Sequence, residues 1–383
     1  MNDFPKKEYL RRLDNIHKKL ENENIDAIVI TSPSNFRYFS GLDSNFWESP
    51  TRPWFLIISK NGKIKALVPS IGLSAIEKTF IKDIEIWQSP NPKDEGTSLL
   101  KKIIQTFPKN ANIGFELGLE TYLRMSINEF LEIKKKLKEY NFIDVTNIVW
   151  NLRKIKSDFE IKNIEKICSI TSNVFDNFNN KIAPGMSERE IAKIFKRELI
   201  NSGADYIMYL SCASGVSGYN QIICNPTEKK LGDGDILIID TGSTSNGYFC
   251  DFDRNFGFGN INQKSLDAYK KLWEATEKTL EIIKPGISCH EVYTSLAKNL
   301  YSNNVESKVG RMGHGFGLQL TEPPSIMNED NTILKKNMIL ALEPSIEVKN
   351  DLMLVHEENI LITENGNRLL SSRTPKELPM INI

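Results

Sequence analysis

Apolar and polar residues follow helical and strand periods in turn along the first 145 residues. A helix over residues 6–23 is predicted by the spacing of its apolar positions, Leu10, Leu13, Ile16 and Leu20. Short apolar runs typical of strands follow at residues 25–31, 54–59, 64–69, 84–88 and 113–117. Amphipathic helices are expected between them, near residues 71–81, 96–106 and 122–139. This alternation predicts an α/β layered domain.

The pattern changes after a bridging segment at residues 147–158. Two long helices are predicted at about residues 157–181 and 187–202, and the second opens with Ser187 and Glu190 at capping-box spacing. Strand-like segments then surround turns at residues 245–247 and 349–351, with helices expected at about 264–283 and 288–302. The 383 residues exceed the ~250–300 at which a single core stops growing. We therefore expect an α/β domain over residues 1–150 and an α+β domain over residues 151–383.

Composition narrows the class of partner. Lys+Arg and Asp+Glu number 49 each, so the net charge is zero and no basic face for nucleic acid or a membrane surface is expected. No apolar run approaches the ~18–20 residues of a membrane span. The five cysteines are odd in number and form no CxxC pair, which favours a reducing compartment. The N-terminus is charged and has no signal-peptide pattern, so a cytoplasmic protein is expected.

Metal-binding side chains follow short apolar or glycine-rich segments in the last third of the chain. They are Asp240, Asp251, His314, Glu343 and Glu357. Four carboxylates and one imidazole, without a thiolate, suit a pair of divalent cations such as Mn, Co, Fe or Zn. Each residue taken singly has a simpler interpretation, since an Asp after a strand is mostly a turn or cap residue. The ordered set within one domain favours a metal site.

The turns predict how these side chains meet. Asp240 and Asp251 flank the turn at residues 245–247, so a hairpin places Asp240 opposite or diagonal to Asp251 or Asp253. In the same way, Glu343 and Glu357 are symmetric about Asn350. Buried carboxylates without partners cost several kcal/mol, so two such pairs in apolar strands indicate cations between them. His314 lies between two glycines, which would let it approach a crowded site.

Four segments of the second half of the chain are IIDTGSTSNGYFCDFDRNF, GHGFGLQLTEPP, ILALEPSIEV and LVHEENILITENG. They resemble the signature segments of the pita-bread metallopeptidases, the family of methionine aminopeptidases, Xaa-Pro aminopeptidases, prolidases and the metal-free creatinase. The front half, including PSNFRYFSGLDS, is similar to the creatinase/prolidase N-terminal domain. The resemblance implies an α/β N-terminal domain, then an α+β pita-bread domain, and a homodimer.

The resemblance also implies a role for each candidate ligand. Asp240 would bind the first metal, Asp251 and Glu357 would bridge the two, and His314 and Glu343 would bind the second. Manganese is the first expectation, and Co, Fe or Zn suit the same donors. A water whose pKa the cations lower would be the nucleophile. Glu343 is in addition a candidate proton shuttle.

The chain departs from the family pattern at two histidines that bind substrate carbonyls in peptide-cleaving members. Ile223 or Cys224 stands at the first position, and Thr321 stands at the second. Thr321 could still donate one hydrogen bond, which makes it a candidate catalytic residue beside Glu343. Asp253 replaces a usual Thr or Ser, and we expect it to be an acceptor near the metals or a partner of Arg254.

Three functions are compatible with these residues. The first is a dimetal hydrolase of the Xaa-Pro peptidase or dipeptidase type, acting on a short peptide or a similar small amide. The second is a small-molecule C–N hydrolase or lyase, similar to creatinase, ectoine hydrolase or sulfoniopropionate lyase. The missing histidines favour this second class over a true peptidase, although Thr241-Gly242 replaces the extra Asp that lyases carry. A non-enzymatic binding module is disfavoured because all five ligands are present.

Overall fold

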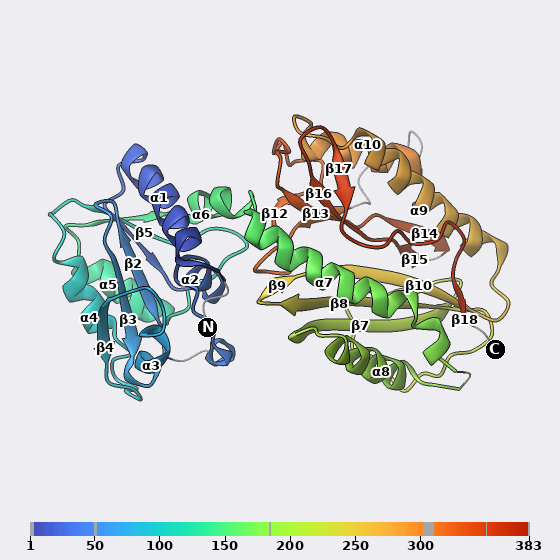
Figure 1. The fold of residues 1–383 in the computed structure, drawn as a ribbon, viewed down its shortest axis with the longest axis horizontal. Coiled ribbons are helices and arrows are strands. Elements are labelled where there is room, and N and C mark those ends of the chain that lie inside the picture. The colour runs from blue at the N-terminus through green and yellow to red at the C-terminus, as the bar shows by residue number, and fades with distance from the viewer. Residues whose placement is uncertain (1–3, 50–51, 184, 302–309, 350, 382–383) are drawn as a thin grey trace. The chain divides into compact units, whose positions relative to one another are not determined.

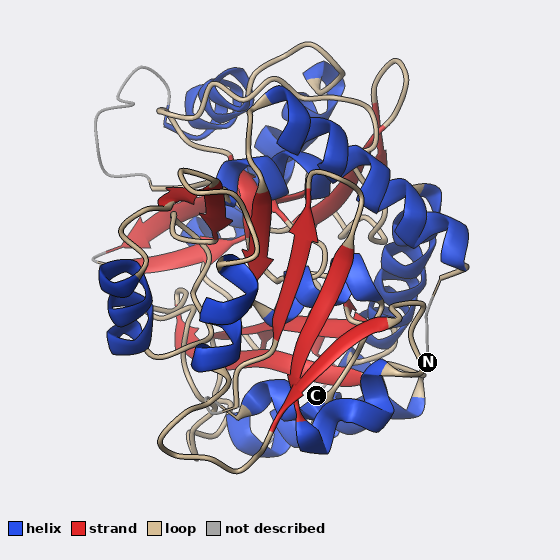
Figure 2. Ribbon diagram, turned by 90° about the vertical axis from the view of Figure 1, so that its left-hand side faces the viewer, coloured by secondary structure: helices blue, strands red, loops and turns tan. Residues whose placement is uncertain are grey.

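The computed structural model describes residues 4–49, 52–183, 185–301, 310–349 and 351–381. The chain divides into two compact units, Met1–Arg153 and Lys154–Ile383. In each unit the strands lie inside and the helices outside (Figures 1 and 2). Within the described ranges, no helix has the length and apolar character needed to cross a lipid bilayer.

The first unit is built on a mixed six-stranded sheet with the order β4-β3-β2-β1-β5-β6. The strands are β1 (Ala27–Ile30), β2 (Phe55–Ser59), β3 (Ile64–Pro69), β4 (Asp83–Trp87), β5 (Asn112–Phe115) and β6 (Asn141–Asp144). β1 pairs antiparallel with β2 and parallel with β5. The five predicted strands are present, and β6 was not predicted because its sequence NFID is short and polar at both ends.

Helices cover both faces of this sheet. They are α1 (Lys6–Asn22), α2 (Pro33–Ser40), α3 (Leu73–Ile76), α4 (Thr97–Ile104), α5 (Ile127–Lys136) and α6 (Thr146–Arg153), with short 3-10 helices at Asn45–Glu48 and Ser70–Gly72. Apolar residues of α4 and α5 share one core with alternate residues of the strands. α1 contacts β2, α2 and α6. The α/β prediction is confirmed, whereas α2 was missed although a proline opens it and Gly41 ends it in the left-handed region.

Four long helices frame the second unit: α7 (Asp158–Asp176), α8 (Glu188–Asn201), α9 (Gln263–Ile282) and α10 (Cys289–Tyr301). All four were predicted, but α7 is shorter than expected because a 3-10 turn, Asn179–Lys181, follows it. The capping box of Ser187 and Glu190 is present, and Ser157 and Glu160 form another at the start of α7. α7 packs across β8, and α8 packs against β7 (Figure 1).

The strands of the second unit form two sheets and a separate ribbon. The first sheet has the order β18-β10-β8-β7, with β9 paired to β8, and the second has the order β12-β11-β13-β16-β17. The first contains β7 (Tyr206–Val216), β8 (Asp235–Ser245), β9 (Tyr248–Phe249), β10 (Phe252–Phe258) and β18 (Met380–Ile381). The second contains β11 (Gly313–Gly315), β12 (Glu322–Ser325), β13 (Ile339–Leu342), β16 (Glu358–Ile362) and β17 (Asn367–Leu369). The ribbon pairs β14 (Ser345–Lys349) with β15 (Leu352–Val355).

The first predicted hairpin forms as expected. Ser245 pairs with Tyr248, and Asn246 and Gly247 both have positive φ, as a two-residue hairpin turn requires. The second hairpin is interrupted: β13 pairs with β16 and β14 with β15, and Glu343 and Glu357 lie in the gap between these two ladders. Asn350, at the tip of the predicted turn, lies outside the described residues.

Candidate metal centre

The first sheet places three aspartates on one face. Asp240 of β8 pairs directly with Asp253 of β10, so their side chains project to the same side of the sheet. Asp251 lies two residues before Asp253 and shares that face by strand alternation. The predicted arrangement, with Asp240 opposite or diagonal to Asp251 or Asp253, therefore forms.

The second sheet supplies the other donors. Leu342 pairs with Glu358, which brings Glu343 and Glu357 to facing positions immediately beyond the end of the ladder. His314 is the central residue of β11, which pairs with β13. A side chain at Gly313 would lie 2.2 Å from the Ala341 carbonyl oxygen, and Gly313 has a φ of +140°. Glycine at this position is what permits β11 to carry His314 so close to β13.

The carboxylates from the two sheets converge. Carboxylate oxygens of Asp240, Asp251 and Glu357, all buried, lie within 4.8 Å of one another. His314 Nε2 lies 3.3 Å from Asp251 Oδ2. Glu343 remains partly exposed, and its charge raises the pKa values of Asp240 and Glu357. The structure thus brings all five residues selected from the sequence into one region of the second unit.

The electrostatics of this region oppose an uncompensated cluster of carboxylates. Burial raises the pKa of Asp251 to about 8, although Arg311 acts in the opposite direction. Burial, followed by the charge of Asp251, raises the pKa of Glu343 to about 7. The pKa values of Asp240 and Glu357 are raised strongly by burial and by neighbouring carboxylates. These carboxylates would be ionised at neutral pH only if a cation nearby lowered their pKa values.

The donor set fits divalent metal ions. Glu357 Oε1 is buried and has no hydrogen-bond partner among the residues that the structure describes. Nearby oxygens and the imidazole nitrogen are the ligands that Mn, Co, Fe and Zn ions accept, and no thiolate belongs to the group. Two divalent cations would neutralise the four carboxylates of the predicted set. We conclude that these residues suit a metal centre.

Stability against pH gives the first expected result. In the metal-free protein the folded-state pKa values of Asp251 and Glu343, about 8 and about 7, exceed their usual values. The folded state then binds more protons than the unfolded state, so the unfolding free energy should be largest near about pH 4–5 and fall as the pH rises to about 8. Urea unfolding of metal-free protein across this range should show the fall. A metal-free protein that becomes more stable towards about pH 8 would contradict it.

Two buried polar residues tie the two sheets together at the centre. Asn359 Oδ1 accepts from the Asp251 amide at 3.2 Å, and its Nδ2 donates to the Asp251 carbonyl. Arg254 Nη1 donates to the Asp253 carbonyl at 2.7 Å and to the Glu357 carbonyl. Its ion pair is with Glu358, at 3.2 Å, so of the two expectations for Asp253 a direct pairing of its side chain with Arg254 is wrong, although the Arg254 charge, against the effect of burial, lowers the pKa of Asp253. Sequence reasoning gave no role to Asn359 or Glu358.

A tyrosine missed from the sequence contacts a candidate ligand directly. The Tyr209 hydroxyl donates to Asp240 Oδ2 at 2.8 Å and lies 3.2 Å from the Ile222 carbonyl oxygen. This contact tethers the segment that carries the first missing histidine position. Ile223 is 87% exposed, whereas the Cys224 amide donates to Ser211 Oγ at 2.8 Å. Since Ser211 pairs with Asp240, Cys224 is the position that lies beside the centre.

The second missing histidine position lies at the start of β12. Thr321 is partly buried and precedes Glu322, which pairs with Gly315 of β11. Glu322 is anchored by a buried ion pair with Lys156 Nζ, at 3.1 Å. Thr321 is therefore held one residue from a fixed point on the strand next to His314.

The other histidines of the second unit lie elsewhere. His356 is buried, with Nε2 3.1 Å from Thr374 Oγ1 and 2.6 Å from Arg373 Nη1. His290, on α10, lies 2.8 Å from the Asn328 carbonyl oxygen through Nδ1. Neither occupies the place of a missing peptidase histidine.

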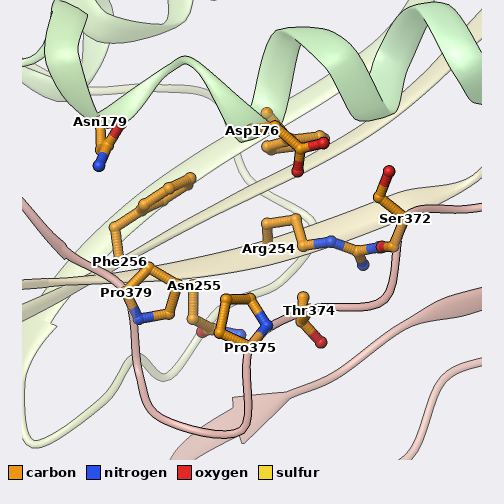
Figure 3. Close-up of a pocket in the computed structure, with 10 residues that line it drawn as sticks. Asp176, Asn179, Arg254, Asn255, Phe256, Ser372, Thr374, Pro375 and Pro379 are labelled. Atoms are coloured by element: carbon orange, nitrogen blue, oxygen red, sulfur yellow. The ribbon is translucent and has the colours of Figure 1, made fainter.

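A cavity of about 180 Å³ lies near the opposite face of β10. Arg254 and Phe256 reach it below the end of α7, together with Asp176 and Asn179 (Figure 3). These two β10 residues alternate with Asp251 and Asp253 along the strand, so they point away from the carboxylates. None of the five candidate ligands lines this cavity. It is separate from the metal centre.

Comparison with known families covers both units. The pattern of Metallopeptidase family M24 matches residues 162–364, which include all five candidate ligands. The pattern of the Creatinase/Prolidase N-terminal domain matches residues 12–155.

Individual relatives match the chain over nearly its full length. The sequence is 28% identical to the Xaa-Pro dipeptidase of Pyrococcus horikoshii over 363 residues, which cover 94% of this chain and 96% of that protein. It is also 28% identical to the Xaa-Pro dipeptidase of Pyrococcus furiosus over 373 residues, 96% of this chain and 99% of that protein. Among solved structures, recombinant prolidase from Thermococcus sibiricus has a TM-score of 0.87 at 25% identity, with 97% of this chain and 99% of that chain covered.

Proposed function

The chain belongs to metallopeptidase family M24, and we propose that it is a metal-dependent hydrolase of the Xaa-Pro dipeptidase type. A creatinase-type N-terminal domain precedes a pita-bread domain, as the sequence predicted. The substrate would be a short peptide or a peptide-like amide. One observation carries the proposal: buried oxygens of Asp240, Asp251 and Glu357 lie within 4.8 Å of one another, with His314 in contact with Asp251.

The residues would divide the work as follows. Asp240 would hold one metal, Asp251 and Glu357 would bridge, and His314 and Glu343 would hold the other. Two such cations, when bound, activate a water at neutral pH and polarise the scissile carbonyl. Glu343, which is partly exposed, would carry the proton from the attacking water to the leaving amine. The Thr321 hydroxyl would donate a hydrogen bond to the substrate carbonyl.

A second candidate function rests on the missing histidines. Cys224 and Thr321 are weaker donors than two imidazoles, and Ile223 points into solvent. A small-molecule C–N hydrolase does not bind a peptide backbone, so it would need fewer hydrogen-bond donors to substrate carbonyls than a peptidase. We retain this function as the alternative because the ligand set itself suits either bond.

A metal-supplemented substrate screen tests the proposal. Metal-free protein would be loaded with Mn²⁺ or Co²⁺, its metal content measured by elemental analysis, and its turnover followed on Ala-Pro, Gly-Pro, dipeptides without proline, small zwitterionic amides and guanidino compounds. We expect two ions per chain and turnover of at least one Xaa-Pro dipeptide, slower than in members with both histidines. A protein that takes up no metal would refute the proposal. Turnover confined to the small amides or guanidino compounds would favour the alternative.

Thr321 provides a test of substrate contact. Thr321→Val should lower kcat/KM about 10-fold or more through the lost hydrogen bond, while the metal content stays at two ions. Thr321→Ser, which keeps the hydroxyl, is the matched control and should stay near the wild-type value. Equal losses in both variants would assign Thr321 a packing role only.

Membership of metallopeptidase family M24 also supports more detailed proposals. We propose manganese as the resident metal, because carboxylate-rich sites suit it. We also propose a cytoplasmic homodimer with residues 1–150 and 151–383 as its two domains. Metal analysis of the native protein would check for manganese, and light scattering would measure the oligomeric state.

A further inference from the structure

Asp253 is a buried carboxylate that the predicted ligand set does not use. Its side chain is 1% exposed. Neither carboxylate oxygen has a hydrogen-bond partner within the described part of the chain. Leaving an ionised carboxylate in this state costs several kcal/mol, so a native structure normally supplies a partner.

The position of Asp253 points to the metal centre. It pairs with Asp240 across β10 and β8, and it shares a face of β10 with Asp251. The carboxylates that act on it, beyond the effect of burial, are those of Asp240, Glu343 and Asp251. Asp253 thus lies beside the cluster on the Asp240 side, next to the three residues whose carboxylate oxygens lie within 4.8 Å of one another.

The nearby donors are engaged elsewhere. Arg254 directs its guanidinium to Glu358 and to the carbonyls of Asp253, Glu357 and Ser372. The Tyr219 hydroxyl donates to Asn255 Oδ1 at 2.9 Å and accepts from the Val355 amide at 2.7 Å. Tyr209 donates to Asp240. Burial raises the pKa of Asp253 and the Arg254 charge lowers it, but no protein group within the described residues donates a hydrogen bond to its carboxylate.

We propose that Asp253 is a sixth protein ligand of the metal centre and supplies a carboxylate oxygen to the cation held by Asp240. This inference rests on the proposed metal centre. With Asp253 the site has five carboxylates and one imidazole, whereas the predicted set has four carboxylates and one imidazole. Carboxylate oxygens suit Mn²⁺, so the added ligand should strengthen manganese binding more than zinc binding.

The test compares Asp253→Asn and Asp253→Thr with wild-type protein. Asparagine keeps the shape and removes the charge, and threonine is the smaller residue usual in the family pattern. Asp235→Asn is the matched control, because Asp235 is a buried carboxylate of the same strand as Asp240 but is satisfied by Lys229 and the Gly232 amide. Calorimetric titration of each metal-free protein with Mn²⁺ and Zn²⁺ gives the affinities. Visible absorption of the Co²⁺-loaded proteins reports the coordination.

Three results are expected from both Asp253 variants. One Mn²⁺ dissociation constant should rise about 10-fold or more, with a smaller change for Zn²⁺, and the Co²⁺ spectrum should change. Thermal unfolding adds a readout that a packing role would not give. The stabilisation of Asp253→Asn by Mn²⁺ should be smaller than that of wild type.

Two results would overturn the inference. If wild type binds two ions and the Asp253 variants keep its Mn²⁺ affinities and Co²⁺ spectrum, Asp253 is not a ligand and the metal centre stands without it. If wild type binds no ion, both the centre and the sixth ligand are refuted. Circular dichroism of each variant establishes that it is folded, and Asp253→Thr keeps the test open if Asp253→Asn does not fold.

Discussion

Replacing Glu357 by alanine should reduce the metal content to one ion per chain or fewer and lower kcat/KM by about 10³-fold or more. Glu357 is 1% exposed, its carboxylate lies within 4.8 Å of those of Asp240 and Asp251, and one of its oxygens has no hydrogen-bond partner among the described residues. A residue in that position would contact the cations that we propose for the cluster. Metal ions contribute several kcal/mol of transition-state stabilisation, and about 4 kcal/mol corresponds to 10³ in rate.

Elemental analysis and steady-state kinetics measure the two effects in the same preparation. Glu364→Gln is the matched control. Glu357 lies just before β16 and Glu364 lies just after it, but Glu364 pairs with Lys336 at the surface. It should leave both quantities unchanged. If Glu357→Ala retained two tightly bound ions, the assignment of Glu357 as a bridging ligand would be wrong. Asp251→Ala should behave as Glu357→Ala does, because Asp251 belongs to the same oxygen cluster and also contacts His314.

Gly313→Ala should produce the largest loss of stability, about 2–6 kcal/mol of unfolding free energy, together with weaker metal binding. The added methyl group would lie 2.2 Å from the Ala341 carbonyl oxygen, which is backbone and cannot rotate away. Overpacking costs about 1–3 kcal/mol, and a φ of +140° adds strain of about 1–3 kcal/mol for a residue with a side chain. Relief by movement of β11 would displace His314, the next residue.

Urea unfolding and Mn²⁺ titration check this prediction. Gly310→Ala is the matched control, because a methyl group there meets no atom of the described residues within 4 Å. It should change the unfolding free energy by less than about 0.5 kcal/mol. Equal stability of Gly313→Ala and Gly310→Ala would show that β11 is not constrained as the structure describes.

The sequence predicted the parts of the centre that depend on local periodicity. Asn246 and Gly247 adopt the positive φ values that a tight hairpin demands, so the register of β8 against the strand that follows was fixed over a few residues. That register, with the two-residue period of a strand, put Asp240 and Asp253 on one face. The glycine before His314 likewise indicated a close approach.

The sequence was less informative where distant segments meet. β7 and β6 were not predicted, because neither combines a clear alternation with turn signals. The second hairpin is divided between two ladders, although its residues are symmetric about one turn. The choice between Ile223 and Cys224 followed only from the contact of Cys224 with Ser211.

Local sequence therefore determined which side chains are candidate metal ligands and which face of each strand they occupy. The tertiary structure alone decided which oxygens meet, since Asp251 and Glu357 belong to different sheets held together by Asn359 and Arg254. It alone showed that Tyr209 contacts Asp240 and that the Asp253 carboxylate has no hydrogen-bond partner among the described residues. The physical reason is that strand period and turn geometry act over a few residues, whereas contacts between sheets depend on how whole cores pack.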